Sequence, residues 1–173
     1  MSLETRLDRI EARFAIEDAM QDYAAAADAK YTAAREKRDA DAVRTCALRQ
    51  AAHFAEDGRW SGGGFGGDLK GRAAIAGFFE TSPWLFTSHL YSAARIGVSE
   101  DVRRATASWQ LVELGVRDTD GRVLLLTGSV SQDWVVTPEG WKIARMGFDR
   151  LHAVTLAKTP EAVRCLIPLG EPA

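Results

Sequence analysis

The spacing of hydrophobic residues predicts helices in the first third of the chain. Over residues 3–23, apolar side chains recur at steps of three, four or six with charges between them, which is typical of an amphipathic helix. Four alanines at 24–27 continue it with the best helix-forming residue. A second helical stretch covers about 38–54 and ends near Gly58, a residue type that often terminates helices. The charged segment 29–38 between them is compatible with an extension of either helix.

Beyond residue 60 the pattern changes. A glycine-rich stretch interrupts regular structure, a short helix follows, and then come four β-rich runs, at 89–98, 102–117, 122–136 and 141–156. Asp-Gly and Pro-Glu-Gly turns between these runs indicate hairpins, so we predict an antiparallel meander. Glycines inside the long runs would let the sheet curl. Helices followed by strands predict an α+β domain with the helices on one face of a curled sheet.

The composition is that of one globular domain. Of 173 residues, 46% are hydrophobic and 27% charged, which is enough for a substantial core, and we expect one domain over 1–158 with a peripheral tail over 159–173. The formal net charge is −2 without a long basic stripe, so neither nucleic acid nor an anionic membrane is an expected partner. The two distant cysteines, Cys46 and Cys165, and the lack of a signal-like or membrane-spanning segment predict reduced thiols and a cytoplasmic protein.

The glycine-rich stretch, residues 61–67, contains a G-x-G-x-x-G pattern at Gly62, Gly64 and Gly67. A dinucleotide fingerprint needs a buried strand before it and a helix after it within a parallel βαβ unit. Here a helical pattern precedes the glycines and the following sheet is predicted to be antiparallel. The stretch is therefore better interpreted as a mobile flap or a bulged edge.

The candidate chemistry lies in Tyr23, Asp28 and His89. Tyr23 belongs, with Ile16, Met20 and Ala27, to the predicted buried face of the first helix. Asp28 lies about 140° around that helix from Tyr23, at the border of the face. A carboxylate on one imidazole nitrogen fixes the tautomer and supports the cation formed when the other nitrogen removes a proton. A phenol can donate a hydrogen bond to a substrate oxygen. Taken singly, each residue is more often structural, as a core aromatic, a solvated carboxylate or a satisfied strand histidine.

Other types of chemistry find less support. The histidines at 53, 89 and 152 lie in separate segments without metal-ligand spacing, and no G-x-S-x-G elbow is present. We therefore expect neither metal nor cofactor, and proton abstraction followed by elimination or isomerisation. Four aromatic residues are candidates for the wall of a substrate pocket: Trp60, Phe65, Trp109 and Trp134. Ordinary packing in the core is an equally good interpretation of each.

Five short motifs, in the correct order, resemble SnoaL-like proteins of the NTF2-like superfamily. They lie at residues 15–28, 54–60, 70–75, 88–90 and 140–143. The resemblance implies a cone, in which a curled antiparallel sheet is closed by helices around a deep, largely apolar pocket. In the family's dehydratases and dehydrochlorinase the working pair is an aspartate late in the first helix and a histidine opening a strand.

These positions fall on Asp28 and His89, and the dehydratases' helix tyrosine falls on Tyr23. A basic residue of the last strand falls on Arg145, where it would stabilise a leaving group or an enolate. The resemblance thus implies a cofactor-independent lyase or isomerase that acts on a small hydrophobic, cyclic molecule, and a homodimer or homotrimer. The long segment 29–49 and the glycine-rich stretch depart from the family pattern, and would alter the pocket mouth or form a lid.

The alternative is a non-catalytic ligand-binding or assembly protein on the same fold, because a fold does not fix a function. In that protein Tyr23, Asp28 and His89 would not converge, or side chains would fill the cavity.

Overall fold

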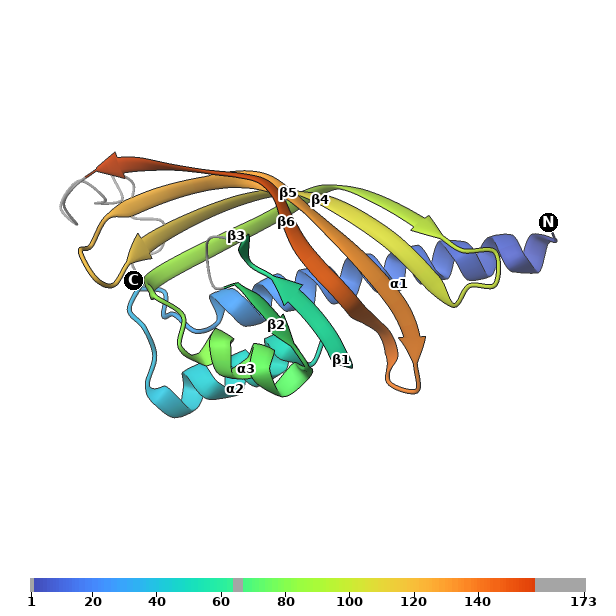
Figure 1. Ribbon diagram of the computed structural model, residues 1–173, viewed down its shortest axis with the longest axis horizontal. Helices are drawn as coiled ribbons and strands as arrows, with labels where there is room; N and C mark the ends of the chain where they lie inside the picture. Colours follow the sequence, from blue (N-terminus) through green and yellow to red (C-terminus); the bar gives the residue numbers. More distant parts are fainter. Residues whose placement is uncertain (1, 64–66, 158–173) are drawn as a thin grey trace, which may run out of the picture.

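The computed structural model describes residues 2–63 and 67–157, which form three helices and one six-stranded sheet (Figure 1). In chain order the elements are α1 (Leu3–Asp28), α2 (Ala40–Ala51), β1 (Phe54–Ser61), β2 (Asp68–Lys70), α3 (Arg72–Glu80), β3 (Trp84–Val98), β4 (Arg104–Arg117), β5 (Val123–Thr137) and β6 (Gly140–Ala157). The tail expected at 159–173 lies outside the described residues.

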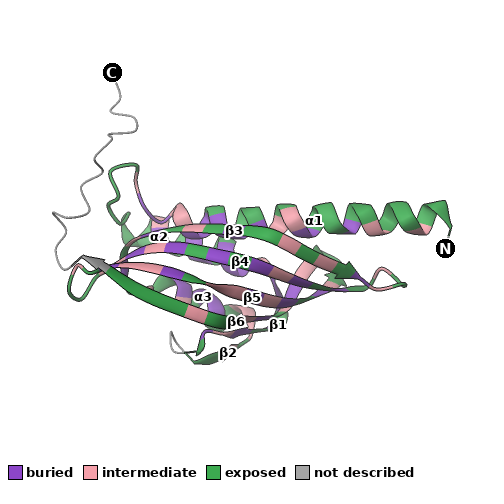
Figure 2. Ribbon diagram, turned by 90° about the horizontal axis from the view of Figure 1, so that it is seen from above, coloured by how far each residue is buried: buried purple, intermediate pink, exposed green. Residues whose placement is uncertain are grey.

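The sheet has the strand order β2-β1-β6-β5-β4-β3. Strands β3 to β6 pair antiparallel with their neighbours, which confirms the predicted meander, whereas β1 pairs parallel to β6 and antiparallel to β2. Figure 1 shows the long strands arching over the three helices, and Figure 2 shows α1 running alongside β3. The helices therefore cover the concave side of a curled sheet.

The packing face of α1 follows the helical period. Ser2 caps the helix, its Oγ accepting a hydrogen bond from the Thr5 backbone N–H at 3.1 Å. The predicted buried residues Ile16, Met20 and Tyr23 are all buried against the sheet and the other helices. None of the helices in the described chain has the length and apolar character that crossing a bilayer requires.

The sequence interpretation was wrong between residues 54 and 58. The predicted helix end is instead the start of strand β1, because Phe54 pairs with Ile143 of β6. At Gly58, a Cβ atom would lie 2.9 Å from the Ala55 carbonyl oxygen and 3.0 Å from that of Ile143. The glycine therefore permits a close approach of two backbones and does not end a helix.

Two further boundaries differ from expectation. The segment between α1 and α2 extends neither helix; it is built of turns with one isolated β-bridge between Tyr31 and Lys37. Strand β3 begins at Trp84, so His89 lies inside the strand and does not open it. The change matters for the site, because a residue inside a strand has a fixed cross-strand neighbour.

Candidate functional site

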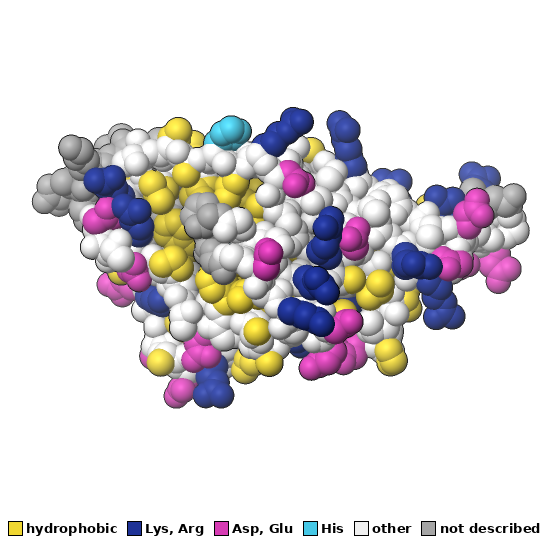
Figure 3. Space-filling model, in the orientation of Figure 1, with side chains coloured by type: hydrophobic (Ala, Val, Ile, Leu, Met, Phe, Trp, Pro, Cys, Tyr) yellow, Lys and Arg dark blue, Asp and Glu magenta, His cyan; other side chains and the backbone are white. Residues whose placement is uncertain are grey.

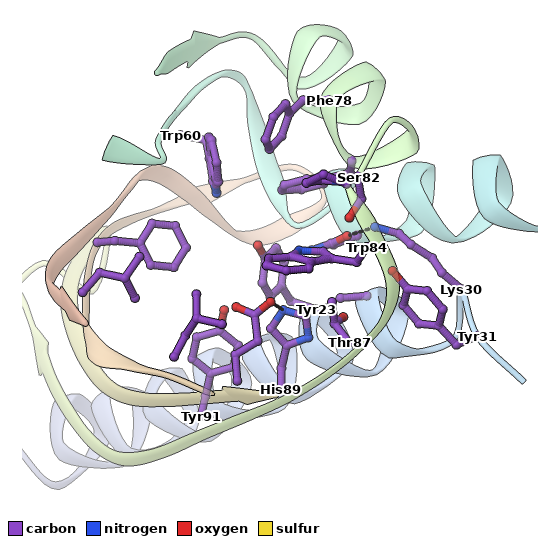
Figure 4. A pocket seen from close by; sticks show the side chains of 18 residues that line it. Tyr23, Lys30, Tyr31, Trp60, Phe78, Ser82, Trp84, Thr87, His89 and Tyr91 are labelled. Atoms are coloured by element: carbon purple, nitrogen blue, oxygen red, sulfur yellow. Dashed lines mark hydrogen bonds and ion pairs between the residues drawn. The ribbon is translucent and has the colours of Figure 1, made fainter. Parts of the chain in front are cut away.

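A cavity of about 90 Å³ lies on the concave side of the sheet, between the helices and strands β1, β3, β4, β5 and β6. Much of its wall is aromatic, including Trp60, Phe78, Phe79 and Trp84. Figure 4 shows the rings of Trp60, Phe78 and Trp84 around the space into which the polar side chains project, and Figure 3 shows hydrophobic side chains gathered at the end of the molecule away from the N-terminus of α1. The arrangement suits an apolar ligand held by a few polar groups.

Asp28 and His89 are in direct contact. Asp28 is the last residue of α1, and its Oδ1 lies 2.6 Å from the His89 Nδ1. Its second oxygen, Oδ2, accepts the His89 backbone N–H at 3.1 Å. Because a carboxylate only accepts, this geometry places a proton on Nδ1 and leaves Nε2 to face the cavity. The carboxylate thereby orients the imidazole from behind.

Glu113 occupies the other side of the same imidazole. It is the direct cross-strand partner of His89 on β4, is buried, and places Oε1 3.6 Å from Nε2. Sequence reasoning missed it, although a signal was present. Glu113 continues the alternating series of Trp109 and Leu111, so it belongs to the inward face of β4.

The two carboxylates change the acidity of His89. Burial alone lowers its pKa, but Glu113 and the hydrogen-bonded Asp28 outweigh that effect, and the pKa of His89 is raised. Burial also raises the pKa of Glu113, an effect that the nearby His89 partly offsets. The pair therefore retains a proton at higher pH than either group would in water.

Tyr23 lines the same cavity without contacting His89 directly. Its ring packs edge-on against Tyr91 at a centroid distance of 6.2 Å, and Tyr91 in turn lies parallel to the His89 ring at 6.2 Å. Burial raises the pKa of the Tyr23 phenol far above its usual value, an effect that Gln50 only partly opposes. Tyr23 is therefore a permanent hydrogen-bond donor at neutral pH and not a base.

Lys30 is a second residue that sequence reasoning missed. It follows Asp28 by two positions, in the charged segment 29–38 that was compatible with an extension of either helix, yet it is buried and lines the cavity. Its Nζ donates to the Gln50 Oε1 at 2.8 Å and lies 5.4 Å from the centre of the Phe79 ring. No carboxylate of the described chain lies within ion-pair distance. Burial lowers the pKa of Lys30 to about 8.

The aromatic residues predicted as pocket walls separate into three groups. Trp60 does line the cavity, and its buried indole Nε1 finds no acceptor among the described residues. Trp109 and Trp134 lie in the core, where both indoles donate to Gln132 Oε1, at 2.8 and 2.9 Å. Phe65 lies outside the described residues.

Arg145 does not reach the cavity. Its side chain is exposed and pairs with Asp133, its cross-strand neighbour, at 3.1 Å between Nε and Oδ2. The expectation that it contacts a leaving group or an enolate is therefore wrong, because the register of β6 directs this position outward. Within residues 2–63 and 67–157, no group of three histidine, cysteine, aspartate or glutamate side chains is arranged to hold a metal ion.

The family model of the SnoaL-like domain matches residues 8–147. The chain belongs to this family. Curated proteins yield no significant match to this SnoaL-like protein. Its α+β architecture is the NTF2-like, cystatin-like fold, as the resemblance of the five motifs had indicated.

Three solved structures are similar to this SnoaL-like protein over most of their length. One from Novosphingobium aromaticivorans, named for an aromatic ring hydroxylase, is 26% identical, with 84% of this chain and 94% of that chain covered and a TM-score of 0.65. A type 2 hexachlorocyclohexane dehydrochlorinase is 18% identical, with 88% and 93% covered and a TM-score of 0.72. A protein named for scytalone dehydratase, also from N. aromaticivorans, is 22% identical, with 88% and 89% covered and a TM-score of 0.63.

Proposed function

We propose that this SnoaL-like protein is a cofactor-independent lyase or isomerase in which His89 removes a proton from a carbon atom of a compact, largely apolar substrate. The observation that carries the proposal is the 2.6 Å contact between Asp28 Oδ1 and His89 Nδ1 at the wall of a cavity. A non-catalytic carrier does not need an imidazole oriented in this way. The similarity to structures named for a dehydrochlorinase and a dehydratase agrees with the reaction class.

In this mechanism His89 Nε2 takes the proton and Asp28 stabilises the imidazolium that forms. In an elimination, the electron pair left on carbon forms a double bond as a leaving group departs from the adjacent carbon. In an isomerisation, the electron pair shifts along the molecule and a proton is added back at another carbon. When the leaving group is a hydroxyl, Nε2 passes the proton to Glu113, and Glu113 passes it to the departing oxygen, which leaves as water. Glu113 suits this relay because it lies 3.6 Å from Nε2 and burial raises its pKa.

The size of the cavity limits the substrate. Its volume of about 90 Å³ is smaller than the roughly 150 Å³ of an engineered protein cavity that binds benzene. The favoured occupant is therefore no larger than a single ring, and a multi-ring molecule would require the walls to move.

The ammonium group of Lys30 is the group that would bind a substrate oxygen. An ammonium group in an aromatic wall is costly to bury when its partner is the neutral side chain of Gln50. A carbonyl oxygen that becomes an enolate during proton removal would supply the missing negative charge, with Tyr23 as a further donor. We therefore favour a small cyclic ketone or a related carbonyl compound, with the acidic carbon toward His89.

Hydrogen–deuterium exchange tests the proposal without knowledge of the leaving group, because elimination and isomerisation share proton removal. The protein in D₂O is incubated with small cyclic ketones carrying hydroxyl, chloro or no substituents, and mass spectrometry follows deuterium uptake and product formation. Wild type should accelerate exchange, and His89→Ala should not. His152→Ala, which alters an exposed histidine, is the matched control. Exchange by His89→Ala at the wild-type rate would refute the assignment, and saturable binding without exchange would favour the carrier function.

A further inference from the structure

The N-terminal half of α1 carries a hydrophobic stripe on its solvent side. The side chains are Leu3, Leu7, Ile10 and Phe14, and they are 69%, 50%, 48% and 61% exposed. Isolated exposed apolar residues are ordinary, but four in a row along one helix mark an interaction surface.

The stripe faces away from the rest of the chain. The side of the helix that packs inward runs through Thr5, Arg9, Ala12 and Ile16, and at 100° per residue it lies roughly opposite the stripe. Figure 1 shows the N-terminal end of α1 extending beyond the sheet, and in Figure 2 most of this part of the helix is coloured as exposed. No described element of the chain covers the stripe.

The spacing of the stripe is that of a coiled coil. Steps of four, three and four place Leu7 and Phe14 at a positions and Leu3 and Ile10 at d positions of two heptads. An ordinary amphipathic helix directs such residues to its own core. Here the core face and the heptad face are separate, so α1 has two apolar sides with different partners.

The charges that flank the stripe indicate which partner the heptad face of α1 binds. Both e positions are acidic, Glu4 and Glu11, and both g positions are basic, Arg6 and Arg13. All four side chains are exposed, and none forms a salt bridge within the described chain. Figure 3 shows charges of both signs projecting from this end of the molecule.

A parallel copy of the helix satisfies this pattern. In parallel packing a g residue faces the e residue of the next heptad on its neighbour, which places Arg6 beside Glu11. Antiparallel packing sets e against e and g against g, so that like charges meet. We propose that residues 3–14 of α1 bind the same segment of other copies of this chain in parallel, forming a homodimer or homotrimer. The globular bodies then lie on the outside and their cavities stay accessible.

Sedimentation of purified protein tests the interface. Wild type should be oligomeric, and Leu7→Gln with Phe14→Gln should be monomeric, with unchanged circular dichroism because both positions are exposed. A matched control, Leu90→Gln with Val154→Gln, removes two equally exposed apolar side chains from the sheet and should stay oligomeric. A monomeric wild type, or an oligomeric stripe variant, would overturn the proposal.

Charge reversal tests the orientation. Arg6→Glu with Arg13→Glu makes every e and g position acidic, and Glu4→Arg with Glu11→Arg makes every one basic. Each variant alone should associate about tenfold more weakly than wild type or worse, and an equimolar mixture should recover association. In an antiparallel arrangement each variant would keep the like-charge contacts of wild type. Wild-type association by either variant alone would therefore rule out parallel packing.

Discussion

His89 and Glu113 face each other across strands β3 and β4, with imidazole Nε2 3.6 Å from carboxylate Oε1. Asp28 holds the other nitrogen of the same ring from the end of α1. The imidazole thus lies between a carboxylate that fixes its orientation and a carboxylate that can exchange a proton with it. The site depends on the docking of one helix terminus against one hairpin.

Replacing Asp28 by asparagine should lower kcat for ketone exchange by about 100-fold or more, the usual contribution of positioned acid–base groups. An amide keeps the shape of the side chain but loses the negative charge that supports the His89 cation. The rise of activity with pH should also move to lower pH, because one cause of the raised His89 pKa is gone. The exposed Asp22→Asn on the same helix serves as the control, and a variant with wild-type kcat and pH profile would show that Asp28 does not position the base.

Glu113→Gln should lower the pKa of His89, since the negative charge beside Nε2 contributes to its rise. In wild type the unprotonated base accumulates only above that raised pKa, so activity increases as pH rises through it. In the variant the same increase should begin at lower pH, while the final rate of water elimination falls because the relay is absent. NMR titration of the His89 ring protons measures the first effect directly; an unchanged titration curve would contradict it.

The same variant should change how stability depends on pH. The folded-state pKa values of His89 and Glu113 are both raised, so their contribution is fully present at low pH and is lost as pH rises through the folded values. The ordinary pKa values are 4.5 for Glu113 and 6.5 for His89. As pH rises from 4.5 to above 6.5, the free energy of unfolding of wild type should therefore fall relative to that of Glu113→Gln. Urea unfolding at several pH values tests this, and parallel curves for the two proteins would contradict it.

Lys30→Met should weaken the binding of a phenolate by about tenfold or more, the value of a hydrogen bond to a charged group. 4-Nitrophenol is a suitable single-ring probe because its ionised form absorbs at longer wavelength. Wild type should lower the apparent pKa of the bound phenol, and the variant should bind the neutral form. Nitrobenzene should bind both proteins equally, and the exposed Lys70→Met should behave as wild type. Equal phenolate binding by Lys30→Met would exclude Lys30 as the oxygen site.

Gln132→Leu should lower the free energy of unfolding by about 2–4 kcal/mol, because the buried indole donors of Trp109 and Trp134 both lose their acceptor. The exposed Gln110→Leu on the adjacent strand is the control. Urea unfolding gives the comparison, and a loss no larger than that of the control would mean that the two indoles find other partners.

Local patterns in the sequence were enough to predict the helices and the hairpins. The period of Ile16, Met20 and Tyr23 identified the buried side of α1, and turn residues located the four long strands. Strand β1 was missed because its pairing partner, β6, lies at the far end of the chain. Local propensity near Phe54 carries no information about such a distant contact.

The site was predictable only where chemistry and family pattern coincided. Asp28 and His89 meet as expected. Lys30 lies in a charged segment, where charge ordinarily means solvent, and Glu113 is a carboxylate on the inward face of β4, where an apolar residue is the rule. Their burial depends on strand register and on the turns after α1. The outward position of Arg145 has the same origin, since a shift of one residue in register exchanges the two faces of a strand.

The parallel pairing of β1 with β6 also orders events during folding. Strands β3 to β6 close through short turns, but Phe54 can meet Ile143 only across the long intervening chain, and such distant contacts carry the larger entropic cost. We therefore expect the hairpin that joins His89 to Glu113 to form before Trp60 on β1 takes its place in the cavity wall. Because Phe148 and Leu151 on β6 also line the cavity, we expect its wall to be complete during translation only after this strand has left the ribosome.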